Sequence, residues 1–333
     1  MGQNTDNTIL DVKDLKVSFY TDNGEVPAVR GVTFDLRKGE SLGIVGESGC
    51  GKSATVSAIM RLLPIPPAKI KDGTIMYEGV DIAKTPEREM LRIRGAKIAM
   101  IFQEPMTALN PVMTVGSQIA EAILQHNKIS KTEANQKAVE LLKLVEIPEA
   151  EKRAASYPHQ LSGGMRQRVM IAMALSCQPE ILIADEPTTA LDVTIQAQIL
   201  DLLRKMRKET GTSILLITHD LGVIAEMCER VIVMYSGRIV EKGDIIPIFE
   251  HPMHPYTEGL FNSIPRMDQD VEELHVIKGR VSDPLDPPSG CWFHPRCPYC
   301  RDKCKEIEPE LRTMQDGREV ACHFAEEVGT HGE

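Results

Sequence analysis

The feature that most constrains this chain is a glycine-rich segment, residues 46–53, which reads Gly-Glu-Ser-Gly-Cys-Gly-Lys-Ser. It fills every position of the pattern G-x-x-x-x-G-K-[ST] and stands between an apolar run, residues 42–45, and a helical pattern that starts at Ala54. Its glycines let successive backbone N–H groups face phosphate oxygens, and the following helix adds its positive N-terminal end. Lys52 is expected to reach the β- and γ-phosphates, and Ser53 a magnesium ion. The predicted nucleotide-binding residues are Gly46, Glu47, Ser48, Gly49, Cys50, Gly51, Lys52, Ser53 and Ala54. A chance match is the alternative, but it does not explain the flanking strand and helix patterns.

Two carboxylates follow a second apolar run. Asp185 and Glu186 come directly after residues 181–184, Ile-Leu-Ile-Ala, and before Pro187. The C-terminal ends of buried strands are where open α/β sheets hold their ligands. We predict that Asp185 holds magnesium, directly or through water, and that Glu186 polarises the attacking water as a general base. A strand that simply ends in charged residues is the alternative, and solvation alone explains this pair poorly.

Composition limits the class of protein. At 333 residues the chain is long enough for at least two structural units. Its 38 Lys and Arg against 48 Asp and Glu give a net charge of -10, and no basic block stands out, so nucleic acid is not expected as the main partner. No apolar run approaches the roughly 18 residues that cross a bilayer. Residues 1–7 lack a basic start and an apolar core, so we expect a soluble chain that is not exported.

Hydrophobic patterning predicts an α/β fold. From Ile9 to Leu36 apolar and polar residues alternate around an Asn23-Gly24 turn signal, which predicts an antiparallel β subdomain. Continuous apolar runs at 181–184 and 214–217 are typical of strands buried on both faces, and they predict a mostly parallel sheet flanked by helices.

Domain boundaries follow from changes in this patterning. Ala138, Leu141, Leu142 and Val145 recur at helical spacing and give one apolar face, and Pro148 is expected to close that helix. After about residue 244 prolines become frequent, which marks a separate C-terminal module. We predict a nucleotide-binding core at 1–102 and 161–244, an inserted helical subdomain at 103–160, and the C-terminal module at 245–333.

A serine and two glycines open another helical pattern. Residues 161–167 read Leu-Ser-Gly-Gly-Met-Arg-Gln, and a serine hydroxyl with free N–H groups at a helix start forms an anion site. Here the chain resembles the ATP-binding subunits of ABC transporters, whose signature motif is LSGGQ, with Met165 in place of the glutamine. The resemblance implies an ABC-type P-loop NTPase core. It assigns nucleotide contacts to Ser162, Gly163 and Gly164.

The same resemblance assigns roles to residues elsewhere in the chain. Gln103 matches the glutamine that senses the γ-phosphate side and is expected among the magnesium ligands, and Asp192 ends the segment Thr-Ala-Leu-Asp that matches the D-loop. His219 matches the switch histidine that contacts the γ-phosphate; a packed or capping histidine is the alternative. Phe19, with Tyr20 behind it, aligns with the aromatic residue that stacks on adenine; a core aromatic is the alternative.

Further segments resemble the branch that imports oligopeptides and dipeptides. They are residues 103–111, 157–160, 254–257 and the cysteine-rich stretch from 290 to 322. The resemblance implies an ATPase of the "D" type at the cytoplasmic face of the membrane, working with a second, non-identical ATPase, two permease subunits and an extracellular peptide-binding protein. It also implies that the phosphate loop and the signature lie on opposite sides of one chain, so a second subunit completes each ATP site. An importer of nickel or another small solute is one alternative, and a non-transport ABC ATPase is another.

Cysteines are unevenly distributed. Cys50, Cys177 and Cys228 are scattered and are expected to be packing residues, whereas five cysteines crowd the last part of the chain. A cluster of thiols in a module with few apolar residues predicts a structural metal site, with buried free thiols as the alternative. The resemblance implies a 4Fe-4S cluster held by Cys291, Cys297, Cys304 and Cys322. Zinc is the other candidate, held by four thiolates or with His294 or His323 replacing one of them. Cys300 is extra to the family pattern and is expected either to replace one ligand or to remain free.

Overall fold

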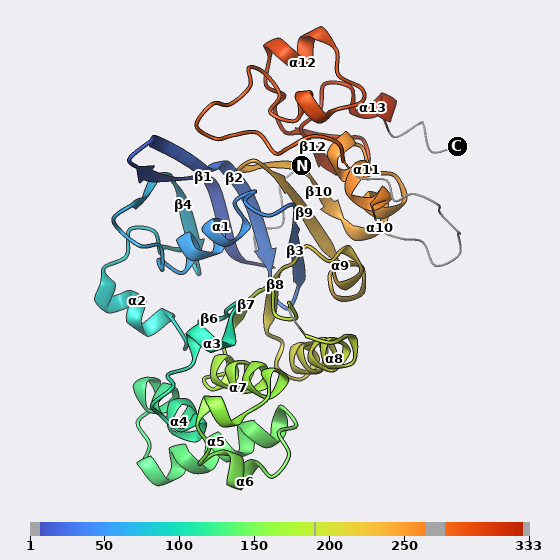
Figure 1. Ribbon diagram of the computed structural model, residues 1–333. Coiled ribbons are helices and arrows are strands. Elements are labelled where there is room, and N and C mark those ends of the chain that lie inside the picture. The colour runs from blue at the N-terminus through green and yellow to red at the C-terminus, as the bar shows by residue number, and fades with distance from the viewer. Residues whose placement is uncertain (1–6, 190, 264–276, 329–333) are drawn as a thin grey trace. The chain divides into compact units, whose positions relative to one another are not determined.

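The computed structural model describes residues 7–189, 191–263 and 277–328. The chain forms two compact units, each made of several stretches of sequence (Figure 1). The first unit comprises Met1–Ile9, Leu36–Ser41 and Lys84–Ile217, and the second comprises Leu10–Asp35, Leu42–Ala83 and Thr218–Glu333. The phosphate loop therefore belongs to the second unit, and the carboxylate pair and the signature belong to the first.

Parallel strands form the centre of the first unit. β7 (Ile181–Asp185) pairs in parallel with β6 (Ile98–Ile101) and with β8 (Ser213–Ile217). Every residue of β7 and β8 is buried, which is why their sequences are continuous apolar runs. The predicted parallel sheet of doubly buried strands is confirmed for this unit.

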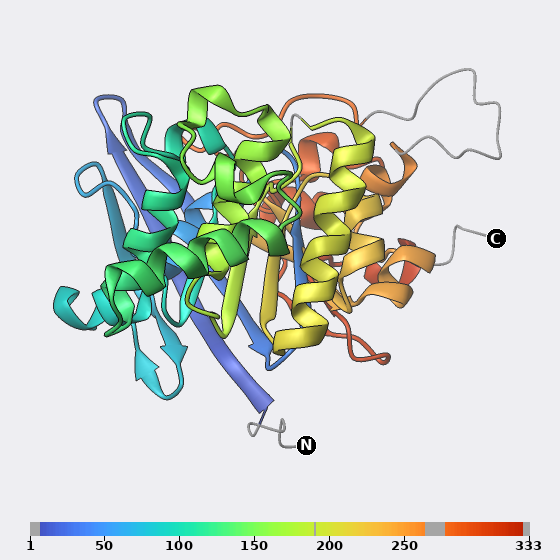
Figure 2. The same ribbon diagram turned by 90° about the horizontal axis from the view of Figure 1, so that it is seen from below.

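Helices make up most of the rest of the first unit. α4 (Val115–His126) and α5 (Lys131–Leu144) pack against each other and against α7 (Gly163–Leu175), and Figure 2 shows these green ribbons side by side. The remaining helical elements of this unit are α2 (Glu87–Ile93), α3 (Pro105–Ala108), α6 (Ala150–Arg153), η2 (Pro158–Gln160) and α8 (Val193–Thr210).

The end of α5 differs from the prediction that Pro148 closes it. The helix ends at Leu144, and Glu146 turns the chain with a φ of 58°. The Ile147 N–H then donates to the Leu142 carbonyl and the Glu146 N–H to the Lys143 carbonyl, both at 2.9 Å, which is a Schellman motif. Hydrogen bonding of the last carbonyls therefore ends the helix before the proline is reached.

An antiparallel sheet lies mainly in the second unit. β1 (Thr8–Thr21) and β2 (Gly24–Arg37) are joined at the Asn23-Gly24 turn, and the sheet continues through β4 (Ala68–Tyr77) to β5 (Val80–Asp81). Residues 10–19 of β1 run antiparallel to residues 68–77 of β4. The predicted antiparallel β subdomain is confirmed, and both strands of its first hairpin have the predicted extent to within two residues.

The phosphate loop of the second unit follows a buried strand. β3 (Ser41–Val45) is buried throughout and pairs in parallel with β9 (Arg230–Tyr235). β9 pairs antiparallel with β10 (Arg238–Asp244), which is followed outward by β12 (Glu319–Val320) and β11 (Arg312–Thr313). Residues near the C-terminus thus extend the same strand array that positions the phosphate loop.

Short elements make up the C-terminal part of the second unit, as its many prolines predict. They are α10 (Ile245–Glu250), α11 (Pro255–Asn262), η3 (His294–Arg296), α12 (Asp302–Glu306) and α13 (Ala325–Val328). The described part of this unit also contains α1 (Lys52–Ile59) and α9 (Leu221–Met227). One small core here consists of the buried Met314, Val320 and Ala325. The segment also packs on β9 through rings, with Phe293 5.2 Å from Tyr235 between centroids.

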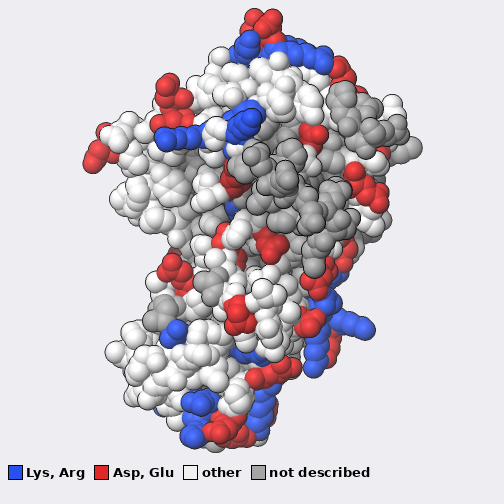
Figure 3. Space-filling model, turned by 45° about the vertical axis from the view of Figure 1, so that its right-hand side comes forward, with Lys and Arg blue, Asp and Glu red and all other residues white. Residues whose placement is uncertain are grey.

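Charged side chains of both signs occur in small groups on the face drawn in Figure 3. The net charge of -10 is therefore not gathered into one patch on the described part of that face. Among the described residues, each helix is too short or too polar to span a bilayer.

Candidate active site

The phosphate loop has the backbone that its glycines permit. Gly46 has a φ of 152° and Gly51 a φ of 102°, and both values lie in the region that side chains disfavour. A Cβ at Gly46 would lie 2.3 Å from the Met234 carbonyl oxygen, and one at Gly51 would lie 2.4 Å from the Ala28 carbonyl oxygen. These two positions therefore need glycine for space as well as for conformation.

The loop lysine lies inside this loop. Lys52 is 6% exposed, and its Nζ donates to the carbonyl oxygens of Gly46 at 2.6 Å and Glu47 at 3.1 Å. Lys52 is the first residue of α1, so its ammonium group is held where the loop curls around the helix start. Cys50 is buried beside it, and that burial raises the pKa of its thiol. Cys50 is therefore an enclosed thiol, in agreement with the expected packing role.

The carboxylate pair lies where β7 ends. Asp185 is the last residue of that strand and is buried. Glu186 has a φ of 48°, a left-handed conformation that is costly for a residue with a side chain, and its N–H donates to the Ile217 carbonyl at 2.8 Å. Parallel pairing of β7 with β8 therefore fixes the direction in which the Glu186 side chain leaves the strand.

Gln103 and Glu186, two predicted site residues of the first unit, are in direct contact. Gln103 Nε2 donates to Glu186 Oε2 at 2.9 Å, and Thr189 Oγ1 donates to the same oxygen at 2.9 Å. Gln103 follows β6 and Glu186 follows β7, and these strands are neighbours, so the sheet brings the two side chains together. Thr189 lies three residues after Glu186 and was not among the predicted site residues.

The signature residues open α7. Ser162 is the N-cap of this helix, and its Oγ accepts from the Met165 N–H at 3.3 Å. Met165, which replaces glutamine in the motif, leaves this capping bond intact because only its backbone takes part. Gln167 Nε2 then donates to the Pro187 carbonyl at 2.6 Å, which ties the signature helix to the turn after Glu186.

The signature and the D-loop share a cleft. Asp192 caps α8, with its Oδ1 accepting from the Ile195 N–H at 2.9 Å. A cleft of about 460 Å³ is lined by Ser162, Gly163, Gly164, Met165, Leu191, Asp192 and Ile195, together with Glu146, Pro148 and Arg168. The capped N-termini of α7 and α8 thus border the same open cleft of the first unit. Ala190, within the D-loop, lies outside the described residues.

His219 belongs to the second unit, where it is exposed. The preceding residue, Thr218, donates its N–H to the Ile44 carbonyl at 3.3 Å, two residues before Gly46. The next residue, Asp220, caps α9 by accepting from the N–H groups of residues 222 and 223. The capping role weighed for His219 is therefore filled by Asp220, and His219 stands beside the strand that leads into the phosphate loop.

The aromatic pair lies on β1 in the antiparallel sheet. Phe19 is half-buried opposite Ala68 of β4, and Tyr20 is 42% exposed. The Tyr20 hydroxyl accepts from Lys71 Nζ at 2.8 Å, and the Lys71 ammonium lies 5.5 Å from the centre of the Tyr20 ring. Stacking of either ring on adenine stays a prediction.

Four of the C-terminal cysteines influence one another electrostatically. Burial raises the pKa of Cys291 to about 11 and that of Cys297 to about 12. Nearby Cys304 and Cys322 add to the rise in the pKa of both thiols, and Cys291 adds to that of Cys297. The Cys291 N–H donates to the Cys304 carbonyl at 2.8 Å, which holds two of the four segments together. All eight cysteines of the chain are free thiols.

The arrangement of these thiols does not match a site for one metal ion. Within residues 7–189, 191–263 and 277–328, no three Cys, His, Asp or Glu residues are grouped to hold an ion. The geometry as described therefore does not support the expected zinc or iron-sulfur module. Cys300 also contacts this set, because its N–H donates to the Cys297 carbonyl at 3.3 Å and Cys304 contributes to raising the pKa of its thiol, after burial.

Comparison with known proteins identifies the class to which this fold and site belong. Residues 29–189, which hold the phosphate loop, the carboxylate pair and the signature, match the ABC transporter family. Residues 240–304 match the C-terminal region of oligopeptide/dipeptide transporters, so this match includes Cys291, Cys297 and Cys304 but ends before Cys322. A dimeric ATP-binding cassette solved in a post-hydrolysis state with ADP and Pi is 30% identical, with a TM-score of 0.65, and covers 71% of this chain and 98% of its own. The nucleotide-binding fold is thus that of an ABC ATPase.

Relatives match nearly the whole chain. The oligopeptide transport ATP-binding protein AppD of Bacillus subtilis is 52% identical over 97% of this chain and 98% of its own length. The dipeptide transport protein DppD of the same organism is 52% identical over 97% and 96%, and OppD of Escherichia coli is 49% identical over 97% and 95%. The chain belongs to the ATP-binding subunits of the oligopeptide/dipeptide ABC transporters, which confirms the resemblance found in the sequence.

Sequence reasoning missed the residues that hold Glu47 from the C-terminal segment. The Glu47 N–H donates to the Tyr256 hydroxyl at 2.8 Å, and Arg296 pairs with the Glu47 carboxylate at 2.6 Å. These partners lie 209 and 249 residues further along the chain. No local pattern could have found them, because each contact depends on how α11 and η3 pack in the second unit.

Proposed function

We propose that this chain binds ATP at its phosphate loop and hydrolyses it to power the import of peptides. Glu186 acts as the general base, and Gln103 and Thr189 orient its carboxylate. The observation that carries this role is the convergence of both hydrogen bonds, each 2.9 Å, on one Glu186 oxygen at the end of a buried strand. Two donors on this carboxylate hold it in one orientation, as a general base that takes a proton from water requires.

Oxygen donors suited to magnesium occur among the predicted site residues. The Ser53 hydroxyl lies at the start of α1, the Asp185 carboxylate at the end of β7, and the Gln103 amide oxygen opposite the nitrogen that bonds Glu186. Carboxylate, carbonyl and hydroxyl oxygens are the ligands that magnesium prefers. When bound, the ion neutralises charge on the β- and γ-phosphates. Lys52 contributes a positive charge there by exchanging its carbonyl partners for phosphate oxygens, and His219 contacts the γ-phosphate from the same unit.

The nucleotide contacts of the signature serve a second subunit. Ser162, Gly163, Gly164 and Asp192 line one open cleft of the first unit. A second, non-identical ATPase completes the site of this chain, and this chain completes the site of the other. The related cassette that was solved with ADP and Pi is dimeric, which supports this arrangement. Phe19 and Tyr20 contribute the adenine contact.

The remaining segments couple hydrolysis to transport. The stretch 103–160, with α4 and α5, is the part that contacts two permease subunits, and an extracellular protein delivers the peptide to them. The chain therefore works at the cytoplasmic face of the membrane as a peripheral subunit. Residues 245–333 form the module that marks the peptide branch, which is supported by the match of 240–304 to the oligopeptide/dipeptide transporter C-terminal region.

Four cysteines of that module hold a 4Fe-4S cluster. Each thiolate of such a cluster binds a different iron, so the sulfurs stay further apart than around one zinc ion. Support for the cluster comes from the resemblance of Cys291, Cys297, Cys304 and Cys322 to the family's ligands and from the match of residues 240–304, which contain three of them, to the transporter C-terminal region. The cluster is structural: it joins segments whose small apolar core of Met314, Val320 and Ala325 does not hold them alone.

Reconstitution tests the main proposal. The chain alone is expected to turn over ATP slowly, and activity is expected to rise when a non-identical ATPase and permease subunits from the same importer are added. Uptake of a labelled peptide into vesicles, against a labelled metal ion such as nickel, tests the cargo. Transporter-level hydrolysis by the isolated chain would contradict the composite site.

Metal analysis tests the cysteine proposal separately. Protein purified without oxygen is expected to be coloured and to contain about four iron and four sulfide per chain. Stoichiometric zinc, or no metal at all, would exclude the cluster. Cys300→Ser is the control, because that cysteine is outside the set of four, and it is expected to leave the iron content unchanged.

A further inference from the structure

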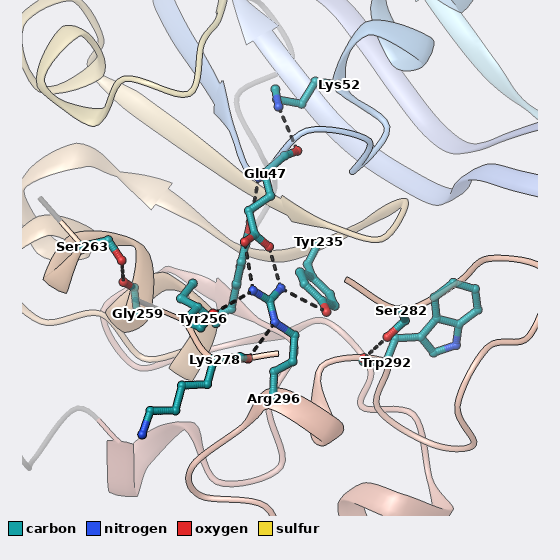
Figure 4. Close-up of polar contacts among 11 residues, drawn as sticks. Glu47, Lys52, Tyr235, Tyr256, Gly259, Ser263, Lys278, Ser282, Trp292 and Arg296 are labelled. Carbon is teal, nitrogen blue, oxygen red and sulfur yellow. Dashed lines mark hydrogen bonds and ion pairs between the residues drawn. The ribbon is translucent and has the colours of Figure 1, made fainter. Parts of the chain in front are cut away.

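Glu47 of the phosphate loop is held from three directions (Figure 4). Its N–H donates to the Tyr256 hydroxyl at 2.8 Å, and its carbonyl oxygen accepts from Lys52 Nζ at 3.1 Å. Its carboxylate accepts two hydrogen bonds from Arg296, at 2.6 Å from Nη1 and 2.9 Å from Nη2. Donor and acceptor groups of this one residue thus join the loop lysine to two elements of the C-terminal segment.

Arg296 is built into its position. Its side chain is 3% exposed, and it also donates to the carbonyl oxygens of Ile277 at 3.4 Å and Lys278 at 3.3 Å. The Tyr235 hydroxyl is 3.5 Å from its Nη1. A bidentate pair between a buried guanidinium and a carboxylate is specific in direction and stronger than a surface ion pair. Arg296 is therefore a fixed positive charge beside the loop.

Tyr256 is equally fixed. It is fully buried as the second residue of α11, and its ring lies 4.7 Å from the Tyr235 ring and 5.4 Å from the Phe293 ring, between centroids. Burial raises the pKa of its hydroxyl, so the group stays neutral and accepts from the Glu47 N–H. The loop backbone at residue 47 is thus oriented by a rigid aromatic cluster.

The ion pair between Arg296 and Glu47 affects the charge that a bound nucleotide would meet at the phosphate loop. Glu47 places a carboxylate in a loop whose purpose is to hold polyanionic phosphates, and an unpaired carboxylate there would repel them. The Arg296 guanidinium neutralises it with a bidentate pair. The Glu47 side chain is 30% exposed, so solvent alone does not screen its charge fully.

We propose that Arg296 is a positioning residue of the ATP site, which neutralises Glu47 and, with Tyr256, holds the phosphate loop ready for the triphosphate. This inference rests on the proposed function, since it assumes that ATP binds at that loop. It makes ATP affinity depend on the C-terminal module. Because Arg296 directly precedes Cys297, and His294 of the same turn bonds the Cys291 carbonyl at 2.9 Å, the order of the cysteine-rich segment sets the position of the arginine.

The test compares ATP affinity among variants of the full chain, measured by titration calorimetry with Mg-ATP. Arg296→Met is expected to weaken binding about tenfold or more, since it leaves the loop carboxylate unpaired. Arg296→Lys, which keeps the charge, is expected to recover part of the loss. The affinity of Glu47→Gln alone is measured as the reference for the double variant. The double variant Arg296→Met with Glu47→Gln is expected to bind like Glu47→Gln, because the charge that needs neutralising is gone.

Controls separate this inference from a loss of folding. Arg312 makes a bidentate pair with Glu326 in the same module, at 2.6 Å for each bond, and Arg312→Met is expected to leave ATP affinity unchanged. If Arg296→Met does not fold, Tyr256→Phe, which keeps the ring and removes the acceptor for the Glu47 N–H, must weaken ATP binding at least threefold by a rough estimate.

Three outcomes overturn the inference. Wild-type affinity in Arg296→Met excludes it, and so does wild-type affinity in Tyr256→Phe. A double variant as weak as Arg296→Met excludes neutralisation of Glu47. In each of these cases two control measurements decide about the proposed function. It is retained if the wild-type chain binds ATP and the Lys52→Ala variant does not. Failure of the wild-type chain to bind ATP overturns the proposed function, and this inference with it.

Discussion

Gln103 Nε2 lies 2.9 Å from Glu186 Oε2 across the carboxyl ends of two neighbouring parallel strands. The contact links the residue expected to sense the γ-phosphate with the residue expected to activate water. On these expected roles, loss of the γ-phosphate after hydrolysis would be sensed at Gln103, which precedes α3 and α4 in the chain. A nucleotide-dependent change in this one hydrogen bond would transmit the hydrolysis step to the helices proposed to contact the permease.

Glu186→Gln is expected to abolish most hydrolysis and to preserve ATP binding. The amide keeps the size of the carboxylate and can still accept from Gln103 and Thr189, but it cannot take a proton from water. Loss of a general base costs about 10²- to 10⁴-fold in turnover. ATPase assays on the assembled transporter measure this, with Glu180→Gln just before β7 as the control. Turnover near that of the control would contradict the assignment.

Lys52→Ala is expected to lose ATP binding, not merely turnover. The Lys52 ammonium is buried in the loop and bonded to the Gly46 and Glu47 carbonyls, so alanine removes both the charge for the phosphates and the contacts that shape the loop. Equilibrium binding of Mg-ATP to the full chain measures the effect. Lys143→Ala, at an exposed lysine paired with Glu151, is the matched control and is expected to bind normally. Equal affinity of the two variants would refute the prediction.

The sequence predicted those parts of the site that are encoded by contiguous residues. The phosphate loop, the β7 carboxylates and the capped start of α7 each depend on a strand, a turn and a helix that are adjacent in sequence. The end of α5 was predicted less well, because Glu146 adopts a left-handed φ and completes a Schellman motif before Pro148. Proline signals where a helix cannot continue, whereas hydrogen bonding decided where this one ended.

Contacts made through tertiary packing could not be predicted. Arg296 was singled out by no motif, and its pairing with Glu47 spans 249 residues. The conformation of Glu186 was equally hidden, since its φ of 48° follows from the bond of its N–H to Ile217 on the neighbouring strand. Both features concern residues that sequence motifs had already singled out, so the motifs predicted the candidate residues and packing set their geometry.

Ser162→Ala is expected to lower hydrolysis by the assembled transporter while the isolated chain binds ATP normally. The composite-site proposal places the Ser162 hydroxyl at the nucleotide of the other ATPase, not at the nucleotide of its own phosphate loop. Ser130→Ala is the matched control, because Ser130 also caps a helix, α5, and its loss costs a similar stability of about 1 kcal/mol. Weaker ATP binding by the isolated Ser162 variant, or equal hydrolysis by both variants, would count against the composite site.

Acid is expected to destabilise the fold through His254. This imidazole is 2% exposed and caps α11 by accepting from the Tyr256 N–H at 3.0 Å, and burial lowers its pKa from 6.5 to about 3. Above pH 6.5 the group is neutral in both the folded and the unfolded chain and adds no pH dependence. Below that value the unfolded chain takes up a proton that the folded chain excludes, so the free energy of unfolding falls as the pH decreases, by at most about 1.4 kcal/mol per pH unit.

His254→Asn isolates this effect, because asparagine also caps helices but does not titrate. Urea unfolding at about pH 7 and about pH 5 is expected to show a larger loss of stability in the wild type than in the variant. Comparing the two chains cancels shared contributions, including that of Glu241, whose pKa burial raises and whose carboxylate accepts from the His254 N–H at 3.0 Å. Equal losses in both chains would contradict the prediction, because they would mean that His254 takes up its proton equally in the folded and the unfolded chain.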